Sequence, residues 1–301
     1  MQNNKVVIII PYFGKYPVWF DLYLYSCSRQ SGVDFLFYSD CDNTVYPSYP
    51  NVRFCNVSYE EYCRYVSNFL GVNFFPANPY KLCDIRPFLG LIHDNDIKAY
   101  EWWGYADVDV IYGDLSLVIN TKTLKRYDVI TTHADRLAGH FTIIRKESLF
   151  TSIGYTIDDW QRKLESEHGL GVDEHDFTKV VRPGITTLFR IYRCIARLWK
   201  LDLYKFLWLP NIIKSVFSRI YIREYNTSDI PKDGEKWVYD FDKGIITNPK
   251  GKSLPYLHFL FFKKTPFAIQ KNYWQGDYWN VNPNLKCGKI IFSNIGVEHE
   301  Q

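Results

Sequence analysis

Buried-strand and helical patterns alternate along the first half of the chain. Val6–Ile10 is continuously aliphatic and ends at a proline turn, which predicts a strand covered on both faces. Val33–Tyr38 predicts a second buried strand and Asn51–Val57 a third strand, whereas the apolar spacing of Val18–Gln30 predicts a helix. Alternation of this kind predicts an α/β fold, with a mixed, mostly parallel sheet and helices on both faces.

The pattern continues to about residue 145. Tyr59–Leu70 predicts a helix that begins after Ser58 as its N-cap. Lys81–His93 predicts another helix, in which Pro87 sets the first turn or bends the axis. Three further strands are predicted at Trp102–Ala106, Tyr127–Thr132 and Phe141–Arg145.

The composition of the chain changes near residues 182–184. Residues 189–223 combine aromatic and aliphatic side chains with many cations and one acid, which predicts a basic aromatic helical segment. Such a segment either lies on an anionic membrane surface or packs on the core with a solvated basic face. We therefore divide the chain into a core of residues 1–185, this segment at 186–225, and short strands and loops at 226–301.

Overall composition excludes several classes of protein. The sequence is 47% hydrophobic and 18% aromatic, which excludes long disordered regions, and its net charge of +3 is too small to indicate nucleic-acid binding. The seven cysteines are scattered without a Cys-x-x-Cys pair, which argues against zinc and disulfides and favours a reducing cytoplasm. No apolar run approaches the length of a transmembrane helix.

Two carboxylates, Asp107 and Asp109, follow the predicted strand at Trp102–Ala106. Side chains two residues apart in a strand point the same way, and ligands bind at strand ends in α/β sheets. Two carboxylates there suit Mn²⁺ or Mg²⁺ held together with a diphosphate. A surface turn is one alternative. A phosphatase with an aspartate nucleophile is another, although such enzymes usually carry the pair near the N-terminus.

The region from Asp84-Ile85-Arg86 to Asp107-Val108-Asp109 resembles the sugar-binding DxD region of GT-A-fold glycosyltransferases. In the clostridial toxins and related bacterial and yeast enzymes, that region reads roughly Ser-Asp-x-x-Arg, Leu, then Gly-Gly-x-Tyr-x-Asp-x-Asp. This chain has Asp-x-Arg, a longer gap, and Trp103-Gly104 for the glycine pair. The resemblance implies a Rossmann-like GT-A nucleotide-sugar-binding fold. It also implies that Asp109 ligates the metal, Asp107 contacts the metal or hydroxyls of ribose and sugar, and Asp84 and Arg86 contact the donor sugar.

A second stretch, LHFLFFKKTPF, resembles the His-x-x-Gly-x-x-Lys-Pro segment of glycogenin-like retaining galactosyl- and glucosyltransferases. The resemblance implies that His258 is a third metal ligand and that Lys263 or Lys264 meets the diphosphate. Here Leu260 or Phe261 stands where the family has glycine, and the proline comes late. The alternative is a structural histidine packed among aromatic rings.

The turn after the first strand is where the GT-A fold usually holds uracil and ribose. Pro11, Tyr12 and Phe13 are therefore predicted to bind the donor, with Ser39 and Asp40 after the second strand contacting base or ribose. An ordinary turn is the alternative.

Three residues are candidates for the chemistry itself. An inverting enzyme needs a carboxylate base to deprotonate the acceptor, and Asp173 or Glu174 in GLGVDEHDF would supply it. His140 is predicted to lie on the acceptor side. A retaining enzyme needs no such base, and these residues would then bind the acceptor; the resemblance around His258 favours retention.

The sequence thus leads to the hypothesis of a metal-dependent hexosyltransferase using Mn²⁺ or Mg²⁺. Its donor would be UDP-galactose or UDP-glucose, and its acceptor a bacterial surface polysaccharide, a lipopolysaccharide or a lipid-linked glycan. Residues 226–301 would complete the active site. The protein would be cytoplasmic or peripheral on the cytoplasmic face of the inner membrane. The alternatives are a phosphatase, a nucleotidyltransferase, or a non-catalytic carbohydrate-binding relative.

Overall fold

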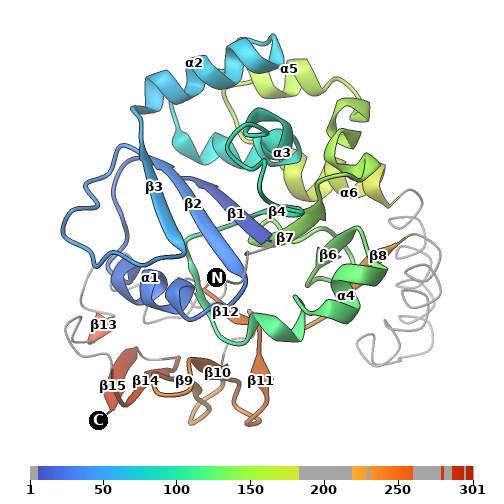
Figure 1. Cartoon of the computed structure of the whole chain (residues 1–301). Coiled ribbons are helices and arrows are strands. Elements are labelled where there is room, and N and C mark those ends of the chain that lie inside the picture. Colours follow the sequence, from blue (N-terminus) through green and yellow to red (C-terminus); the bar gives the residue numbers. More distant parts are fainter. Residues whose placement is uncertain are drawn as a thin grey trace.

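A computed structural model describes residues 6–182, 219–228, 231–259, 279–280, 287–294 and 296–300. A seven-stranded sheet, in the order β3-β2-β1-β4-β7-β6-β8, forms the centre of the molecule (Figure 1). Its strands are β1 (Val6–Pro11), β2 (Val33–Ser39), β3 (Val52–Asn56), β4 (Trp102–Ala106), β6 (Val129–Thr131), β7 (Phe141–Arg145) and β8 (Ile220–Ile222).

Most neighbouring strands of this sheet run parallel. β1 pairs in parallel with β2 and β4, β2 with β3, and β6 with β8. Only β7 is antiparallel to both of its neighbours, β4 and β6. The predicted mixed, mostly parallel α/β sheet is confirmed.

Helices cover both faces of the sheet because alternate strand residues point to opposite sides. Val6, Ile8 and Ile10 of β1 pack in one core with α1, whereas Val7 and Ile9 pack in a second core with α2 (Figure 1). The α-helices are α1 (Phe20–Ser28), α2 (Tyr59–Leu70), α3 (Leu89–Ile92), α4 (Thr121–Arg126), α5 (Trp160–Glu165) and α6 (Phe177–Val181). The other helices are the 3₁₀ helices η1 (Pro79–Phe88), η2 (Leu115–Leu117), η3 (Leu149–Thr151) and η4 (Ile153–Thr156), and the π-helix η5 (Val172–Asp176).

Helix α2 matches its prediction, including its N-cap. The Ser58 hydroxyl accepts from the Glu61 N–H at 3.2 Å, and the Glu61 carboxylate accepts from the Ser58 N–H at 3.1 Å. This reciprocal capping box satisfies donors that the first turn leaves unpaired.

The single α-helix predicted at Lys81–His93 is wrong. A ten-residue 3₁₀ helix, η1, is followed there by the short helix α3. Pro87 lacks an N–H and its ring clashes with the carbonyl four residues back, so an α-helix is disfavoured at this point. At its N-terminal end, η1 begins with Pro79, which directly follows the N-cap Asn78.

The C-terminal part of the chain builds a second, smaller set of strands, as predicted for this region. A six-stranded sheet has the order β11-β10-β9-β14-β15-β13, and β5 (Val110–Tyr112) pairs separately with β12 (Tyr256–His258). Trp237 and Tyr239 of the larger of these sheets pack in the same core as α1. The strands are β9 (Trp237–Asp240), β10 (Ile245–Thr247), β11 (Ser253–Leu254), β13 (Trp279–Asn280), β14 (Lys289–Phe292) and β15 (Val297–Glu300).

Most of the basic aromatic segment lies outside the described residues. Its last part contributes β8, an edge strand of the central sheet, rather than a helix. Among the residues that the structure describes, no helix is long and apolar enough to cross a membrane.

Candidate functional site

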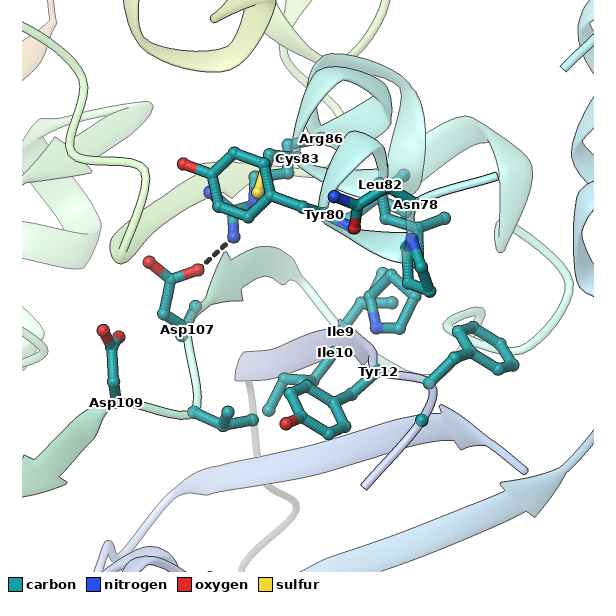
Figure 2. A pocket seen from close by; sticks show the side chains of 17 residues that line it. Ile9, Ile10, Tyr12, Asn78, Tyr80, Leu82, Cys83, Arg86, Asp107 and Asp109 are labelled. Carbon is teal, nitrogen blue, oxygen red and sulfur yellow. Dashed lines mark hydrogen bonds and ion pairs between the residues drawn. The ribbon is translucent and has the colours of Figure 1, made fainter. Parts of the chain in front are cut away.

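A cavity of about 470 Å³ opens at the carboxyl ends of β1 and β4. One wall is formed by residues 9–14, a second by residues of η1, and residues 106–109 connect them (Figure 2). Strand ends of this kind are where α/β sheets bind their ligands.

Asp107, Asp109 and His258 form a group that could hold a metal ion. One ligand atom from each lies within 4.8 Å of the other two, and His258 Nε2 lies 3.5 Å from Asp109 Oδ1. Both aspartates line the cavity; the Asp107 side chain is 31% exposed, whereas Asp109 is buried. Two carboxylates and an imidazole make an oxygen and nitrogen donor set that suits Mn²⁺. The structure thus brings together the three residues predicted as ligands.

Backbone pairing explains why His258 lies beside Asp109, although the two residues are 149 positions apart in the sequence. Strand β12 runs antiparallel to β5, with His258 opposite Val110, and the Phe259 N–H donates to the Asp109 carbonyl at 2.9 Å. On the other side, the Trp19 indole N–H donates to the Val108 carbonyl at 2.8 Å. These bonds fix the turn that carries both aspartates.

His258 is held by two further contacts. Its Nδ1 lies 3.0 Å from the Ser228 hydroxyl, and its ring stacks on His140 with centroids 3.9 Å apart. Burial and, after it, the neighbouring His258 lower the pKa of His140 well below its usual range. His140 is therefore neutral near pH 7 and packs beside the metal group. It does not line the described cavity, and its catalytic role stays a prediction.

Arg86 links the metal group to one of the predicted bases. Its guanidinium forms ion pairs with Asp107 and, at 2.6 Å, with Asp173 Oδ2. Burial raises the pKa of Asp173 to about 6, although Arg86 acts in the opposite direction. Beside it, the Glu174 carboxylate accepts from the Gly139 N–H at 3.0 Å. A carboxyl group with a pKa near 6 can exchange a proton close to neutral pH.

Asp84 lies apart from the cavity, although Arg86 is only two residues away. Its carboxylate accepts from Lys81 Nζ at 2.8 Å and from the N–H groups of Leu170 and Val172 at 2.8 and 2.9 Å. Lys81 donates to two further backbone carbonyls, and both side chains are 1% exposed. The structure thus gives Asp84 contacts with the segment before Asp173, and its predicted contact with the donor stays a prediction.

Pro11, Tyr12 and Phe13 line the cavity at the end of β1, and their predicted contact with the donor stays a prediction. Ser39 and Asp40 do not line the cavity. Asp40 accepts from the Gly14 N–H at 3.1 Å, and Ser39 is fully buried. Gly14 has φ of 107°, a conformation that favours glycine and lets the turn after β1 close. Asp40 therefore supports the turn in this structure.

Tyr80 and Cys83 line the cavity together with Arg86, although neither is among the residues predicted from the sequence. These three residues follow one another at intervals of three, the period of a 3₁₀ helix. The available signal was the pair of prolines at 79 and 87, which disfavours an α-helical period. The predicted diphosphate contacts, Lys263 and Lys264, lie outside the described residues.

The chain belongs to the family described as "Family of unknown function (DUF6625)", whose sequence model matches residues 8–264. No curated protein matches the sequence. The solved structures that match include a glycosyltransferase involved in the glycosylation of the major capsid of PBCV-1. The two chains are 10% identical with a TM-score of 0.39, over 85% of this chain and 93% of that one. A likeness at this level carries no argument for activity.

Proposed function

We propose that this DUF6625 family member is a metal-dependent GT-A-fold glycosyltransferase. It transfers a hexose from UDP-galactose or UDP-glucose to a bacterial surface-polysaccharide or lipopolysaccharide acceptor. The observation that carries the proposal is the group of Asp107, Asp109 and His258 beside a cavity at the strand ends. The resemblance to the DxD region and to the glycogenin-like histidine segment supports the same reading.

The chain's own residues divide the cavity into two sides. Pro11 and Tyr12 form the wall after β1, where uracil and ribose would lie. Asp107, which is ion-paired with Arg86, and Asp109 also line the cavity, and the diphosphate and the first atoms of the sugar would lie against them. A Mn²⁺ or Mg²⁺ ion bound there would offset the charge of the departing nucleoside diphosphate.

Arg86 would serve the donor, and its ion-pair partner Asp173 would serve the acceptor. Arg86 is a permanent cation next to Asp107, so it can hold a hydroxyl or phosphate oxygen of the donor. Asp173, with its pKa raised to about 6 by burial, would take the acceptor proton in an inverting reaction. In a retaining reaction, which the histidine segment favours, Asp173 and Glu174 would orient the acceptor. A lipid-linked acceptor would place the protein at the cytoplasmic face of the inner membrane.

The deciding experiment is calorimetric titration of UDP with and without Mn²⁺. Wild type should bind UDP only with the metal, and Asp109→Ala should lose that binding while keeping its melting temperature. Asp114→Ala is the matched control, because this aspartate caps η2 and does not line the cavity. Absence of UDP binding in wild type would overturn the proposal. Phosphate release from p-nitrophenyl phosphate that Asp107→Asn abolishes would favour a phosphatase instead.

A further inference from the structure

The 3₁₀ period of η1 sorts its residues into faces. With three residues per turn, side chains at i, i+3 and i+6 lie in line along the helix. Tyr80, Cys83 and Arg86 form such a line, and all three face the cavity. Arg86 lies at the inner end, ion-paired with Asp107, so the line leads outward from the metal group to Tyr80.

Tyr80 is an exposed aromatic residue on a rigid backbone. It is 73% exposed, yet its N–H donates to the Asn78 side chain at 3.0 Å, and Pro79 precedes it. Gly169 lies close to its ring, since a Cβ at position 169 would sit 3.6 Å from Tyr80 Cδ1. Figure 2 shows the ring on the same side as Arg86 and Cys83, with Tyr12 across the cavity.

The exposed ring of Tyr80 at the cavity can stack against a sugar ring. The face of an aromatic ring is electron-rich, and the apolar face of a pyranose presents C–H groups of slight positive charge. We propose that Tyr80 is a stacking platform for a hexopyranose ring at the mouth of the cavity. This inference rests on the proposed glycosyltransferase function and adds a sugar-binding residue to it.

The hexopyranose that stacks on Tyr80 can belong either to the donor or to the acceptor. A donor sugar would extend from the diphosphate at Asp107 along Cys83 toward Tyr80. An acceptor sugar would approach from solvent and lie on the exposed face of the ring. The uracil base is a third aromatic partner, but the wall predicted for it, at Tyr12, is on the other side of the cavity.

The donor is tested by calorimetric titration of UDP, UDP-galactose and UDP-glucose in Mg²⁺, with wild type, Tyr80→Ala and Tyr80→Phe. If the donor sugar stacks, Tyr80→Ala should weaken both UDP-hexoses about 3- to 10-fold and leave UDP unchanged. Tyr80→Phe keeps the ring and should behave as wild type. Phe69→Ala on α2 is the matched control, since Phe69 is 45% exposed and does not line the cavity.

The acceptor is tested by saturation-transfer NMR of methyl α- and β-glucosides and galactosides, with UDP and Mg²⁺ present. Signals that Tyr80→Ala removes and Tyr80→Phe keeps would assign the platform to the acceptor. Unchanged results in both experiments would overturn the inference, as would an equal loss of UDP and UDP-hexose affinity, which indicates base stacking. Failure of wild type to bind UDP is a different result, which overturns the proposed function.

Discussion

Two faces of the helix η1 carry charged residues, one face buried in the protein and the other lining the cavity. Lys81 and Asp84 are buried and hydrogen-bond to each other and to backbone groups, whereas Arg86 on the neighbouring face lines an open cavity. Asp84 and Arg86 are two residues apart, which in a 3₁₀ helix is a rotation of about 240°. The period of the helix, more than proximity in sequence, therefore decides which charge reaches the cavity.

The two faces also differ in how their charges are satisfied. The Asp84 carboxylate receives three hydrogen bonds and Lys81 Nζ makes three, so this pair ties η1 to residues 163–172. On the cavity face, Arg86 is shared between Asp107 and Asp173, and a ligand or metal can compete for either contact. The buried pair therefore serves the fold, whereas Arg86 is placed to respond to what binds.

The largest effect should come from breaking the buried pair. Asp84→Ala leaves the Lys81 ammonium buried without its counter-charge, which should lower the free energy of unfolding by about 3–5 kcal/mol. Urea denaturation measures this loss, and calorimetry should find unchanged UDP affinity in the protein that remains folded. Asp84→Asn keeps the size and part of the hydrogen bonding. If that variant kept full stability and lost affinity for UDP-hexoses but not UDP, the predicted contact of Asp84 with the donor would be supported.

The central sheet was predictable from the sequence because its strands are covered on both faces. β1 is an aliphatic run and β2 a mainly aromatic one, and nearly all of their side chains are buried on both faces, so the strands could be recognised from composition. α2 was predictable from its N-cap Ser58 and its amphipathic spacing. The helix at Lys81–His93 was not, because the 3₁₀ period depends on where Pro79 and Pro87 force the backbone.

The candidate metal group was also predictable, since each residue belongs to a local motif with a known chemical use. The link between Arg86 and Asp173 was not, because it joins residues 87 positions apart through tertiary packing. Tyr80 escaped notice for another reason. The two prolines argue against an α-helical period, but that alone does not show that the helix turns this tyrosine toward the cavity.

The next largest effect is a dependence of stability on pH, caused by Asp173, the second ion-pair partner of Arg86. The pKa of Asp173 is raised to about 6 by burial, from 3.8 in an unfolded chain, so the folded protein binds its proton more tightly. The stability that this group contributes is present below pH 4 and is lost as the pH rises through 6. Wild type should thus lose about 2–3 kcal/mol relative to Asp173→Asn between pH 4 and pH 7. Parallel urea titrations measure this difference, and a pH-independent difference would contradict the raised pKa.

A smaller effect should follow from crowding the same cluster. A Cβ at Gly139 would lie 2.9 Å from Asp173 Oδ2, 3.0 Å from Arg86 Nη1 and 3.1 Å from Glu174 Oε1. Gly139→Ala should therefore push these groups apart and cost about 1–3 kcal/mol. Gly169→Ala is the matched control, because its Cβ would meet only Tyr80 at ordinary contact distance. Equal melting temperatures for the two variants would show that the cluster accommodates the methyl group.

The smallest expected effect is a change in Mn²⁺ affinity when Arg86, on the cavity face of η1, is replaced. Because Arg86 is ion-paired with Asp107, a cation that binds Asp107 must share this carboxylate with the guanidinium. Arg86→Gln removes that competition, so Mn²⁺ alone should bind about tenfold more tightly, equal to about 1.4 kcal/mol. Calorimetric titration of Mn²⁺ without nucleotide measures the change, with Arg53→Gln as a control on β3 outside the cavity. Weaker Mn²⁺ binding in Arg86→Gln would mean that Arg86 holds Asp107 in its ligating position, and the cavity face would then resemble the buried face in fixing structure.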